Sequence, residues 1–209
     1  MNANRKVTLY HAPNSRSTGT WMLLEELGAD YELRVLNMKA GETRQPAYLA
    51  VNPMGKVPAI LHNGTLITEQ VAIVLYLADL YPEAGLAPAI GDALRGPYLR
   101  WTVFYASCFE PAITDRALKR EPPQPSMASY GDFDTMMKTL TDQLGRGPYL
   151  LGEKFSAADV LWGTALTWIV KFGLIEATPA IQAYIDRANV RPAAVKVRTK
   201  DAELAAAQG

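Results

Sequence analysis

The period of hydrophobic and polar positions changes about a third of the way along the chain. Before residue 81, short segments in which polar and apolar residues alternate, such as 6–10 and 31–36, are interleaved with segments of helical spacing. After residue 90, apolar residues recur at helical spacing over long segments, and no further strand pattern follows. We therefore expect a mixed α/β layer followed by an all-α second half.

The first half is expected to fold in the order β-α-β-α-β-β-α, a thioredoxin-like sheet covered by helices. An apolar helical face precedes Gly28, which ends that helix at its C′ position. Asn63 and Gly64, between two apolar runs, predict a tight hairpin because a type I′ turn needs two residues that tolerate positive φ. Thr68 is expected to cap the helix that follows.

Turn-forming residues at 82–88 mark a boundary between two domains. We expect an α/β domain at 1–81, a linker at 82–89 and an all-α domain at 90–209. Ser156 and Asp159 predict a capping box, in which each side chain bonds to the other residue's backbone N–H. The helices of the second domain are expected at about 91–118, 126–144, 157–171, 179–188 and 192–205.

Composition excludes several classes of partner and site. The 21 basic and 21 acidic residues cancel, whereas nucleic acid or an anionic membrane surface favours a clustered basic excess. No charged-then-apolar leader and no apolar run of about 18 residues is present, so we expect a cytoplasmic protein without a membrane span. The single cysteine, Cys108, excludes an internal disulfide. With only His11 and His62 to supply imidazole, we expect no metal site.

Residues 52–70 carry the strongest signal for ligand binding. Val57-Pro58 lies just before a strand, where a cis peptide bond is accommodated and turns the Val57 backbone outward to pair with an extended peptide. The first turn of the helix that follows directs unpaired N–H groups, beside Glu69 and Gln70, toward the same loop. A ligand with a peptide backbone and a terminal carboxylate fits both features.

This order of elements, with Pro58 and Glu69, resembles the glutathione-binding half of the cytosolic glutathione transferases. The capping-box segment 152–159 is similar to that of their α-helical domain, so the resemblance covers essentially the whole chain. The pattern Asn-Ser-Arg-Ser before a helix that ends in Leu-Glu-Glu-Leu-Gly, at 24–28, is most similar to bacterial and fungal members. The resemblance implies the glutathione transferase fold, glutathione as co-substrate and a homodimer.

A thioredoxin-like layer without its own cysteine must borrow a thiol, and glutathione brings one. Lowering a thiol pKa from about 8.5 by two units needs roughly 2.7 kcal/mol of preferential thiolate binding. A hydroxyl donor, a helix N-terminus and a cation can supply it, and the loop 14–17 offers all three. By likeness to serine-type members, Ser15 is our first candidate. Ser17 follows, with a helix N-cap as its alternative role; Arg16 is a candidate cation and Asn14 an alternative amide donor.

For binding, the resemblance assigns Val57 to the cysteinyl backbone of glutathione and Glu69 to its γ-glutamyl amino group. The family usually has serine after this acid, to bond the glutamyl carboxylate; here Gln70 stands in its place. Lys56 is expected to meet the glycyl carboxylate. Arg44 is a weaker candidate for the same role.

The second substrate is expected against the long helix of the all-α domain. Trp101 and Tyr105 share a helical face, and Cys108 lies three residues further on, so they are candidates to line one groove. An aromatic stripe at this spacing is more often part of a core or a dimer interface than of a pocket. His11, at the end of the first strand, is a candidate to border the site, with a local turn role as its alternative.

We therefore expect a glutathione transferase that activates the thiol for attack on a small hydrophobic electrophile, for example in detoxification. One alternative is a glutathione-dependent disulfide reductase or peroxidase, in which Asn14 faces the sulfur. Another is a non-catalytic protein that binds glutathione or a hydrophobic ligand, for which Gln70 is the supporting departure. The sequence leaves open the electrophile and which side chain of the loop 14–17 contacts the thiol.

Overall fold

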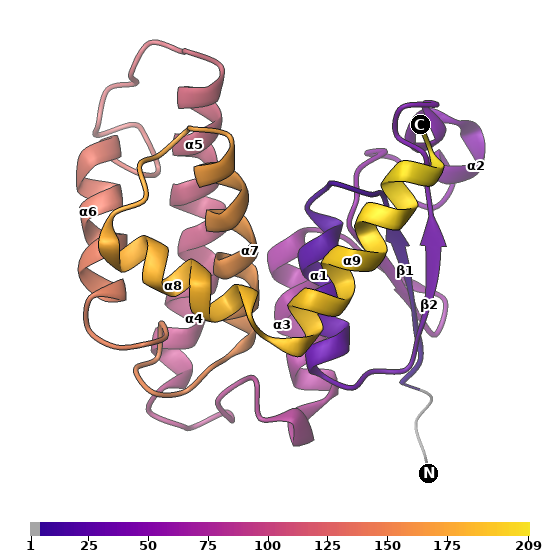
Figure 1. The fold of residues 1–209 in the computed structure, drawn as a ribbon, viewed down its shortest axis with the longest axis horizontal. Coiled ribbons are helices and arrows are strands. Elements are labelled where there is room, and N and C mark those ends of the chain that lie inside the picture. The colour runs from indigo at the N-terminus through magenta and orange to yellow at the C-terminus, as the bar shows by residue number, and fades with distance from the viewer. Residues whose placement is uncertain (1–4) are drawn as a thin grey trace. The chain divides into compact units, whose positions relative to one another are not determined.

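The computed structural model describes residues 5–209, which divide by contact into two compact units. The first unit contains the residues up to Leu86 together with Val190–Gly209, and the second spans Ala87–Asn189. The division expected from the sequence assigns 190–209 to the all-α domain, whereas here this segment belongs to the first unit. Figure 1 shows its helix α9 (Pro192–Ala207) lying along α1 (Ser17–Glu26), and the two helices are in contact.

The first unit has the expected order of elements. Its four strands form one sheet in the order β2-β1-β3-β4, in which β1 is parallel to β2 and antiparallel to β3, and β3 is antiparallel to β4. The strands are β1 (Val7–His11), β2 (Tyr31–Val35), β3 (Ala59–His62) and β4 (Thr65–Ile67). Besides α1 and α9, its helices are η1 (Glu42–Arg44), α2 (Pro46–Leu49), α3 (Gln70–Leu80) and η2 (Pro82–Ala84). The thioredoxin-like arrangement is confirmed.

Of three local features predicted for this unit, the hairpin turn and the helix end are confirmed and the helix cap is not. Asn63 and Gly64 have φ values of 49° and 78°, as a type I′ hairpin requires. Gly28 follows α1 with φ 61°. The predicted Thr68 cap is wrong, because α3 begins one residue later than such a cap requires and Glu69, with φ 62°, takes the N-cap position without a side-chain bond.

Apolar side chains between the sheet and its helices form the core of the first unit. α1 packs against β1, α3 and α9. Burying one leucine or isoleucine side chain contributes about 1.5–3 kcal/mol relative to leaving it exposed. The buried leucines and isoleucines of this core therefore hold α1 and α3 on the sheet. Its fully buried members include Leu9, Leu23, Leu24, Ile60, Ile73 and Leu77.

The second unit is all-α, as expected. Its first long helix starts at Arg95 rather than near 91, and a π-helical turn at Tyr105–Phe109 interrupts it. Pro111 follows this turn; a proline lacks the N–H and crowds the carbonyl four residues earlier, which explains the wider turn. The helices are α4 (Arg95–Phe104), α5 (Glu110–Ala117), α6 (Phe133–Leu144), α7 (Ala157–Lys171) and α8 (Pro179–Asn189).

The predicted start of α6 is wrong, and the predicted capping box at the start of α7 is confirmed. The helix expected from about 126 begins only at Phe133, after Gly131 at φ 68° and the N-cap Asp132, whose side chain accepts from the Thr135 N–H. The capping box of Ser156 and Asp159 at the start of α7 is confirmed. Of the helices within residues 5–209, none is long and apolar enough to cross a membrane.

Candidate functional site

The register of the sheet brings three separate segments of the chain to one edge. Tyr10 pairs with Ala59, and Ile60 pairs with Ile67. Because β3 is antiparallel to both neighbours, the end of β1, the beginning of β3 and the end of β4 lie at the same edge. The segments that meet there are the first loop (residues 12–16), Val57-Pro58 and Glu69-Gln70. These segments contain most of the residues that the sequence analysis assigns to glutathione.

Of the two serines that the sequence analysis proposes for the thiol, only Ser15 keeps some exposure. Ser15 is 8% exposed and Ser17 is 0% exposed. The Ser15 hydroxyl lies 2.6 Å from that of Ser17 and accepts from the Ser17 backbone N–H at 3.2 Å. Asn14 and Arg16, on either side of Ser15, are exposed. A thiol at this surface can therefore meet Ser15 but not Ser17.

Ser17 holds the end of β1 against the start of α1. Its Oγ lies 2.8 Å from Nδ1 of His11 and accepts from the Ala12 backbone N–H at 3.1 Å. It is the first residue of α1, and Arg16 occupies the N-cap position. The N-cap alternative for Ser17 is therefore wrong, because the helix begins one residue too early for it.

His11 does not border an open site. Its ring is 0% exposed, because it lies between Ser17 and a carboxylate on α9. Nε2 is 2.8 Å from Oδ1 of Asp201. The hydrogen-bonded row Ser15, Ser17, His11 and Asp201 runs inward from the surface at the sheet edge.

Asp201 also belongs to this network, although nothing in its sequence context indicates it. Its carboxylate, 5% exposed, accepts from the Asn14 backbone N–H at 3.2 Å and from the Thr18 hydroxyl at 3.1 Å, in addition to His11. It is one acid in an Ala-rich helix, and the spacing of that helix carries no sign of a partner 190 residues away. Only folding brings it to the first loop.

The loop before β3 holds the backbone of Val57 at the sheet edge. The Val57-Pro58 peptide bond is cis, as the sequence predicts. The preceding carbonyl, that of Lys56, accepts from the Tyr48 hydroxyl at 2.6 Å and from the Asn52 amide at 2.8 Å. Burial raises the pKa of Tyr48, so this phenol remains a donor at neutral pH. Among residues 5–209, no hydrogen bond uses the Val57 backbone.

The two cations proposed for the glycyl carboxylate have different surroundings. Lys56 is exposed, and in the described part of the chain its ammonium has no hydrogen bond or ion pair. Arg44 donates to the Met54 carbonyl at 3.2 Å. Gly55 fits beneath it with φ 59°, and a Cβ there would lie 2.6 Å from the Thr43 carbonyl oxygen. The Arg44 side chain is thus bonded to the loop before Val57, whereas that of Lys56 is exposed to solvent.

Glu69 and Gln70 lie at the start of α3. Glu69 is exposed, and no hydrogen bond or ion pair of its carboxylate is found within residues 5–209. The Gln70 amide donates to the Arg16 carbonyl at 3.2 Å. This bond joins the start of α3 to the first loop, so the replacement of the usual serine has a structural consequence at the site.

The residues predicted to line a second-substrate groove lie in the second unit. Trp101 and Tyr105 are 2% and 3% exposed. Their rings pack on Trp162, at centroid distances of 6.4 and 5.5 Å. They do share a helical face, but that face is in the core, so we leave both out of the candidate site. Cys108 is half-buried, with Sγ 3.4 Å from the Ser129 carbonyl oxygen.

No resident metal is indicated by the side chains that the structure describes. Within residues 5–209, no three His, Cys, Asp or Glu side chains gather in a way that would hold an ion. The groups found at the sheet edge include the hydroxyl of Ser15, the charges of Lys56, Glu69 and Arg16, and backbone N–H groups.

Comparison with known proteins gives matches over most of the chain. The family model "Glutathione S-transferase, N-terminal domain" matches residues 5–79, and "Glutathione S-transferase, C-terminal domain" matches residues 115–187. Glutathione S-transferase GstA of Escherichia coli O157:H7 is 29% identical over 187 residues, 88% of this chain and 93% of that protein. The disulfide-bond oxidoreductase YfcG of Escherichia coli K12 is 25% identical over 200 residues, 90% of this chain and 92% of that protein.

One of the solved structures to which this chain is similar contains bound glutathione. The structure of a sphingomonad glutathione S-transferase complexed with glutathione has a TM-score of 0.76 and 31% sequence identity to this chain. The similarity covers 93% of this chain and 98% of the sphingomonad chain.

Proposed function

This chain belongs to the glutathione S-transferase family, and on that premise we propose that it binds glutathione and activates its thiol for attack on a small hydrophobic electrophile. The observation that carries the proposal is the meeting of three segments at one sheet edge: the Ser15 hydroxyl, the unpaired Val57 backbone and the Glu69 carboxylate. The complex of the sphingomonad relative with glutathione supports the same ligand.

Each part of glutathione has a partner of suitable chemistry. The cysteinyl backbone pairs with the N–H and C=O of Val57, as an added strand does. The γ-glutamyl ammonium meets the Glu69 carboxylate, and the glycyl carboxylate meets the Lys56 ammonium. The glutamyl carboxylate lies at the N-terminus of α3, where first-turn N–H groups and the helix dipole favour an anion. Arg44 acts indirectly, by holding the loop that ends at Val57.

The sulfur is placed at Ser15. A hydrogen bond from the Ser15 hydroxyl to the thiolate, together with the N-terminal dipole of α1 and the charge of Arg16, lowers the thiol pKa. A decrease of two pKa units corresponds to about 2.7 kcal/mol. Three contributions of about 1 kcal/mol each are of that order.

The first experiment is a titration of bound glutathione with pH, following the ultraviolet absorbance of the thiolate. Wild type is expected to lower the thiol pKa by about two units, and Ser15→Ala to return it most of the way to about 8.5. Ser107→Ala, which removes an exposed hydroxyl in the second unit, is the matched control. Glutathione that binds but titrates as in solution contradicts the conjugating function and favours a non-catalytic binding protein.

A second candidate function is glutathione-dependent disulfide reduction. It is favoured by the similarity to the disulfide-bond oxidoreductase YfcG over most of the chain and by the exposed Asn14 beside Ser15. In this function the Asn14 amide donates to the sulfur. If so, Asn14→Ala is expected to abolish reduction of a model disulfide, and Ser15→Ala to retain it. If the protein instead conjugates glutathione to a chloronitroarene, and Ser15→Ala abolishes this activity while Asn14→Ala retains it, the result supports conjugation.

We further propose a homodimer in the cytoplasm, with a role such as detoxification, because these are usual in the family. Sedimentation equilibrium tests the assembly and is expected to give twice the mass of one chain. A monomer at micromolar concentration contradicts the dimer and leaves the glutathione site, which is built within the first unit, unaffected.

A further inference from the structure

A continuous row of hydrogen-bonding groups runs inward from Ser15. The successive distances are 2.6 Å from Ser15 Oγ to Ser17 Oγ, 2.8 Å from Ser17 Oγ to His11 Nδ1, and 2.8 Å from His11 Nε2 to Asp201 Oδ1. Every member is buried. All belong to the first unit: His11 ends β1, Ser15 lies in the first loop, Ser17 begins α1, and Asp201 comes from α9.

The chemistry of the groups fixes where the protons lie when His11 is neutral. Asp201 as a carboxylate only accepts, so Nε2 of His11 carries the ring proton and Nδ1 carries a lone pair. Ser17 therefore donates its proton to Nδ1 at 2.8 Å, the shorter of its two contacts with an acceptor, the other being the Ala12 carbonyl oxygen at 3.3 Å. Two hydroxyl oxygens at 2.6 Å need a proton between them, so Ser15 must donate to Ser17. The Ala12 N–H fills the remaining lone pair of Ser17.

In this arrangement Ser15 has no proton to offer outward. Its Oγ accepts from the Ser17 N–H at 3.2 Å and donates to the Ser17 hydroxyl, which leaves one lone pair facing the surface. A thiol placed at Ser15 can donate its S–H to that lone pair. A thiolate cannot be stabilised there until the direction of the row is reversed.

A second proton on His11 reverses the direction. Nδ1–H then donates to Ser17, Ser17 donates to Ser15, and Ser15 points its O–H outward. In both arrangements every lone pair and proton of Ser17 and His11 has a partner, and only the group that Ser15 turns toward the surface is left for a ligand. The two arrangements differ by one proton at Nδ1 and by whether Ser15 accepts or donates at the surface.

We propose that His11 takes the thiol proton of glutathione through Ser15 and Ser17, with Asp201 stabilising the imidazolium. This proposal rests on the proposed function. The S–H proton passes to Ser15, the Ser15 proton to Ser17 and the Ser17 proton to Nδ1, which leaves a thiolate that accepts from Ser15 and an imidazolium paired with Asp201. No other reactant is needed. His11 and Asp201 act through Ser15 and are positioning residues.

The surroundings of His11 suit an imidazolium. The facing charge is the Asp201 carboxylate from α9, and the indole of Trp21 from α1 packs against the imidazole in a T-shaped arrangement at a centroid distance of 5.1 Å. The Asn14 N–H and the Thr18 hydroxyl also donate to the Asp201 carboxylate, both to Oδ2, which leaves Oδ1 for His11. A buried cation that is paired and hydrogen-bonded in this way avoids most of the cost of an isolated charge.

A purely structural attachment of α9 to α1 would not need the hydrogen bonds from Ser17 to His11 and from His11 to Asp201. Two ion pairs, Glu26 with Arg191 and Glu25 with Lys196, already join α1 to α9. The Thr18 hydroxyl also reaches Asp201 but lies outside the row. Thr18→Val therefore weakens this attachment and leaves the proton path complete, which makes it the matched control.

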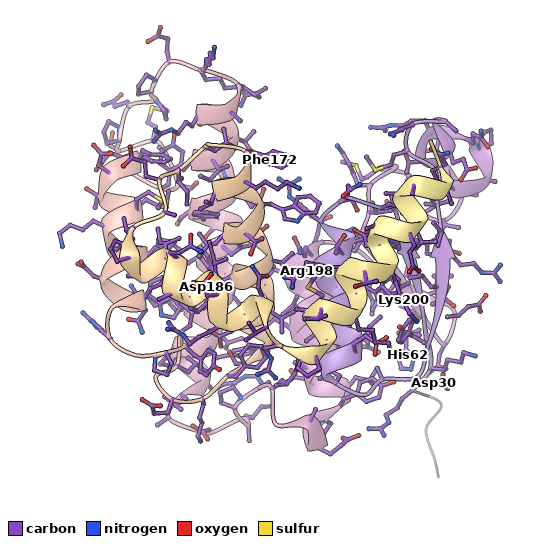
Figure 2. The ribbon with its side chains drawn as sticks, in the orientation of Figure 1. Asp30, His62, Phe172, Asp186, Arg198 and Lys200 are labelled. Carbon is purple, nitrogen blue, oxygen red and sulfur yellow. The ribbon has the colours of Figure 1, made fainter. Side chains whose placement is uncertain are left out.

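Nitrogen NMR of histidine-labelled protein tests the proposal on wild type. The chain has only two histidines, and His62, on β3 (Figure 2), bonds to the Tyr76 hydroxyl and is the internal control. Glutathione is expected to convert His11 from a neutral ring to an imidazolium. S-methylglutathione, which has no thiol proton, is expected to leave His11 neutral, and His62 should respond to neither.

The outcomes separate this proposal from the proposed function. A thiolate absorbance with His11 unchanged overturns the relay but keeps the transferase site. Absence of a thiolate in wild type overturns the proposed function itself.

Variants give a second, independent test. His11→Gln and Ser17→Ala are expected to bind glutathione within about threefold of wild type, to leave its thiol protonated at neutral pH, and to lower conjugation by about 10²-fold or more. Thr18→Val is expected to keep the thiolate. Equal loss of the thiolate in all three variants overturns the relay, because it indicates a structural role for the whole network. If His11→Gln does not fold, Ser17→Ala and the wild-type spectra decide.

Discussion

At the scale of single residues, Glu69 has a backbone conformation that its side chain disfavours. Its φ of 62° and ψ of 113° lie outside the regions that non-glycine residues normally occupy. Such conformations cost about 1–3 kcal/mol and persist at sites where the surrounding structure enforces them. Here the strain sets the carboxylate beside the N-terminus of α3, where we place the γ-glutamyl end of glutathione.

Replacing this residue by glycine separates stability from binding. Glu69→Gly is expected to raise the free energy of unfolding by about 1 kcal/mol, because glycine adopts positive φ freely, and to weaken glutathione binding at least about 10-fold through loss of a charge pair. Urea unfolding and calorimetric titration measure the two effects. Lys119→Gly, at φ 51° in the second unit, should stabilise without affecting binding. A destabilised Glu69→Gly protein would contradict the assignment of strain.

At the scale of secondary-structure elements, α9 is attached to α1 by charged side chains. Arg191 donates from Nε and Nη2 to the two carboxylate oxygens of Glu26, at 2.7 and 2.6 Å. Lys196 donates to Glu25 at 2.7 Å, and the Tyr31 hydroxyl also donates to Glu25, at 2.6 Å. The forked arginine contact fixes direction as well as distance.

The Glu25 contact predicts a dependence of stability on pH. Burial raises the pKa of Glu25, but hydrogen bonds from Lys196 and Tyr31 outweigh it and hold the pKa below its ordinary value of 4.5. A carboxyl with a lowered folded-state pKa stabilises above the unfolded value, and this contribution is lost as the pH falls through the folded value.

Glu25→Gln should therefore lose less stability than wild type between pH 5 and pH 3, by less than about 1 kcal/mol because solvent screens the pair. Urea unfolding at several pH values measures it. Ser107→Ala, which removes an exposed hydroxyl away from this contact, should keep the wild-type slope. A Glu25→Gln slope equal to wild type would contradict a lowered pKa.

The start of α7 depends on Asp159, which is almost fully buried. It accepts from the backbone N–H groups of Leu150 and Ser156 and from the hydroxyls of Ser156 and Tyr184, at 2.8–2.9 Å. Burial nevertheless raises the pKa of Asp159. Removing the carboxylate leaves several buried donors without an acceptor, each at a cost of about 1–3 kcal/mol.

Asp159→Ala is therefore expected to lower the free energy of unfolding by about 3 kcal/mol or more. Asp132→Ala removes the exposed N-cap of α6 and should cost only about 1 kcal/mol. Both are measured by urea unfolding. Equal losses would mean that Asp159 acts as an ordinary cap.

At the scale of the whole molecule, the two ends of the chain build one unit. α9 buries Ala193, Ala194, Val197 and Asp201 within the first unit. A chain ending at Asn189 is expected to lose glutathione binding and to melt at least about 4 °C lower, because apolar surface is exposed and His11 loses its partner. Thermal melting and calorimetry measure this. A chain ending at Ala205, which keeps all four residues, should behave as wild type; retained binding in the shorter chain would contradict the dependence.

Features that depend on neighbouring residues were determined by the sequence alone. The hairpin at Asn63-Gly64, the end of α1 at Gly28 and the capping box at Ser156 each follow from local backbone or side-chain chemistry, and each is found. The order of the elements and the all-α second half follow from hydrophobic periodicity in the same way. The Thr68 cap and the start of α6 failed because positive φ at Glu69 and at Gly131 moves a helix start, which propensity does not reveal.

Tertiary structure alone decided the features that depend on contacts between distant segments. Sheet register, not sequence spacing, brings Ser15, Val57 and Glu69 to one edge. The sequence contained His11 and Asp201 but no sign that they meet across 190 positions, because a single acid in an Ala-rich helix has no local partner. In the second unit, packing between helices likewise buries Trp101 and Tyr105 in the core. Local chemistry fixed the elements, whereas burial against distant elements decided which polar groups are paired and which remain at the surface for a ligand.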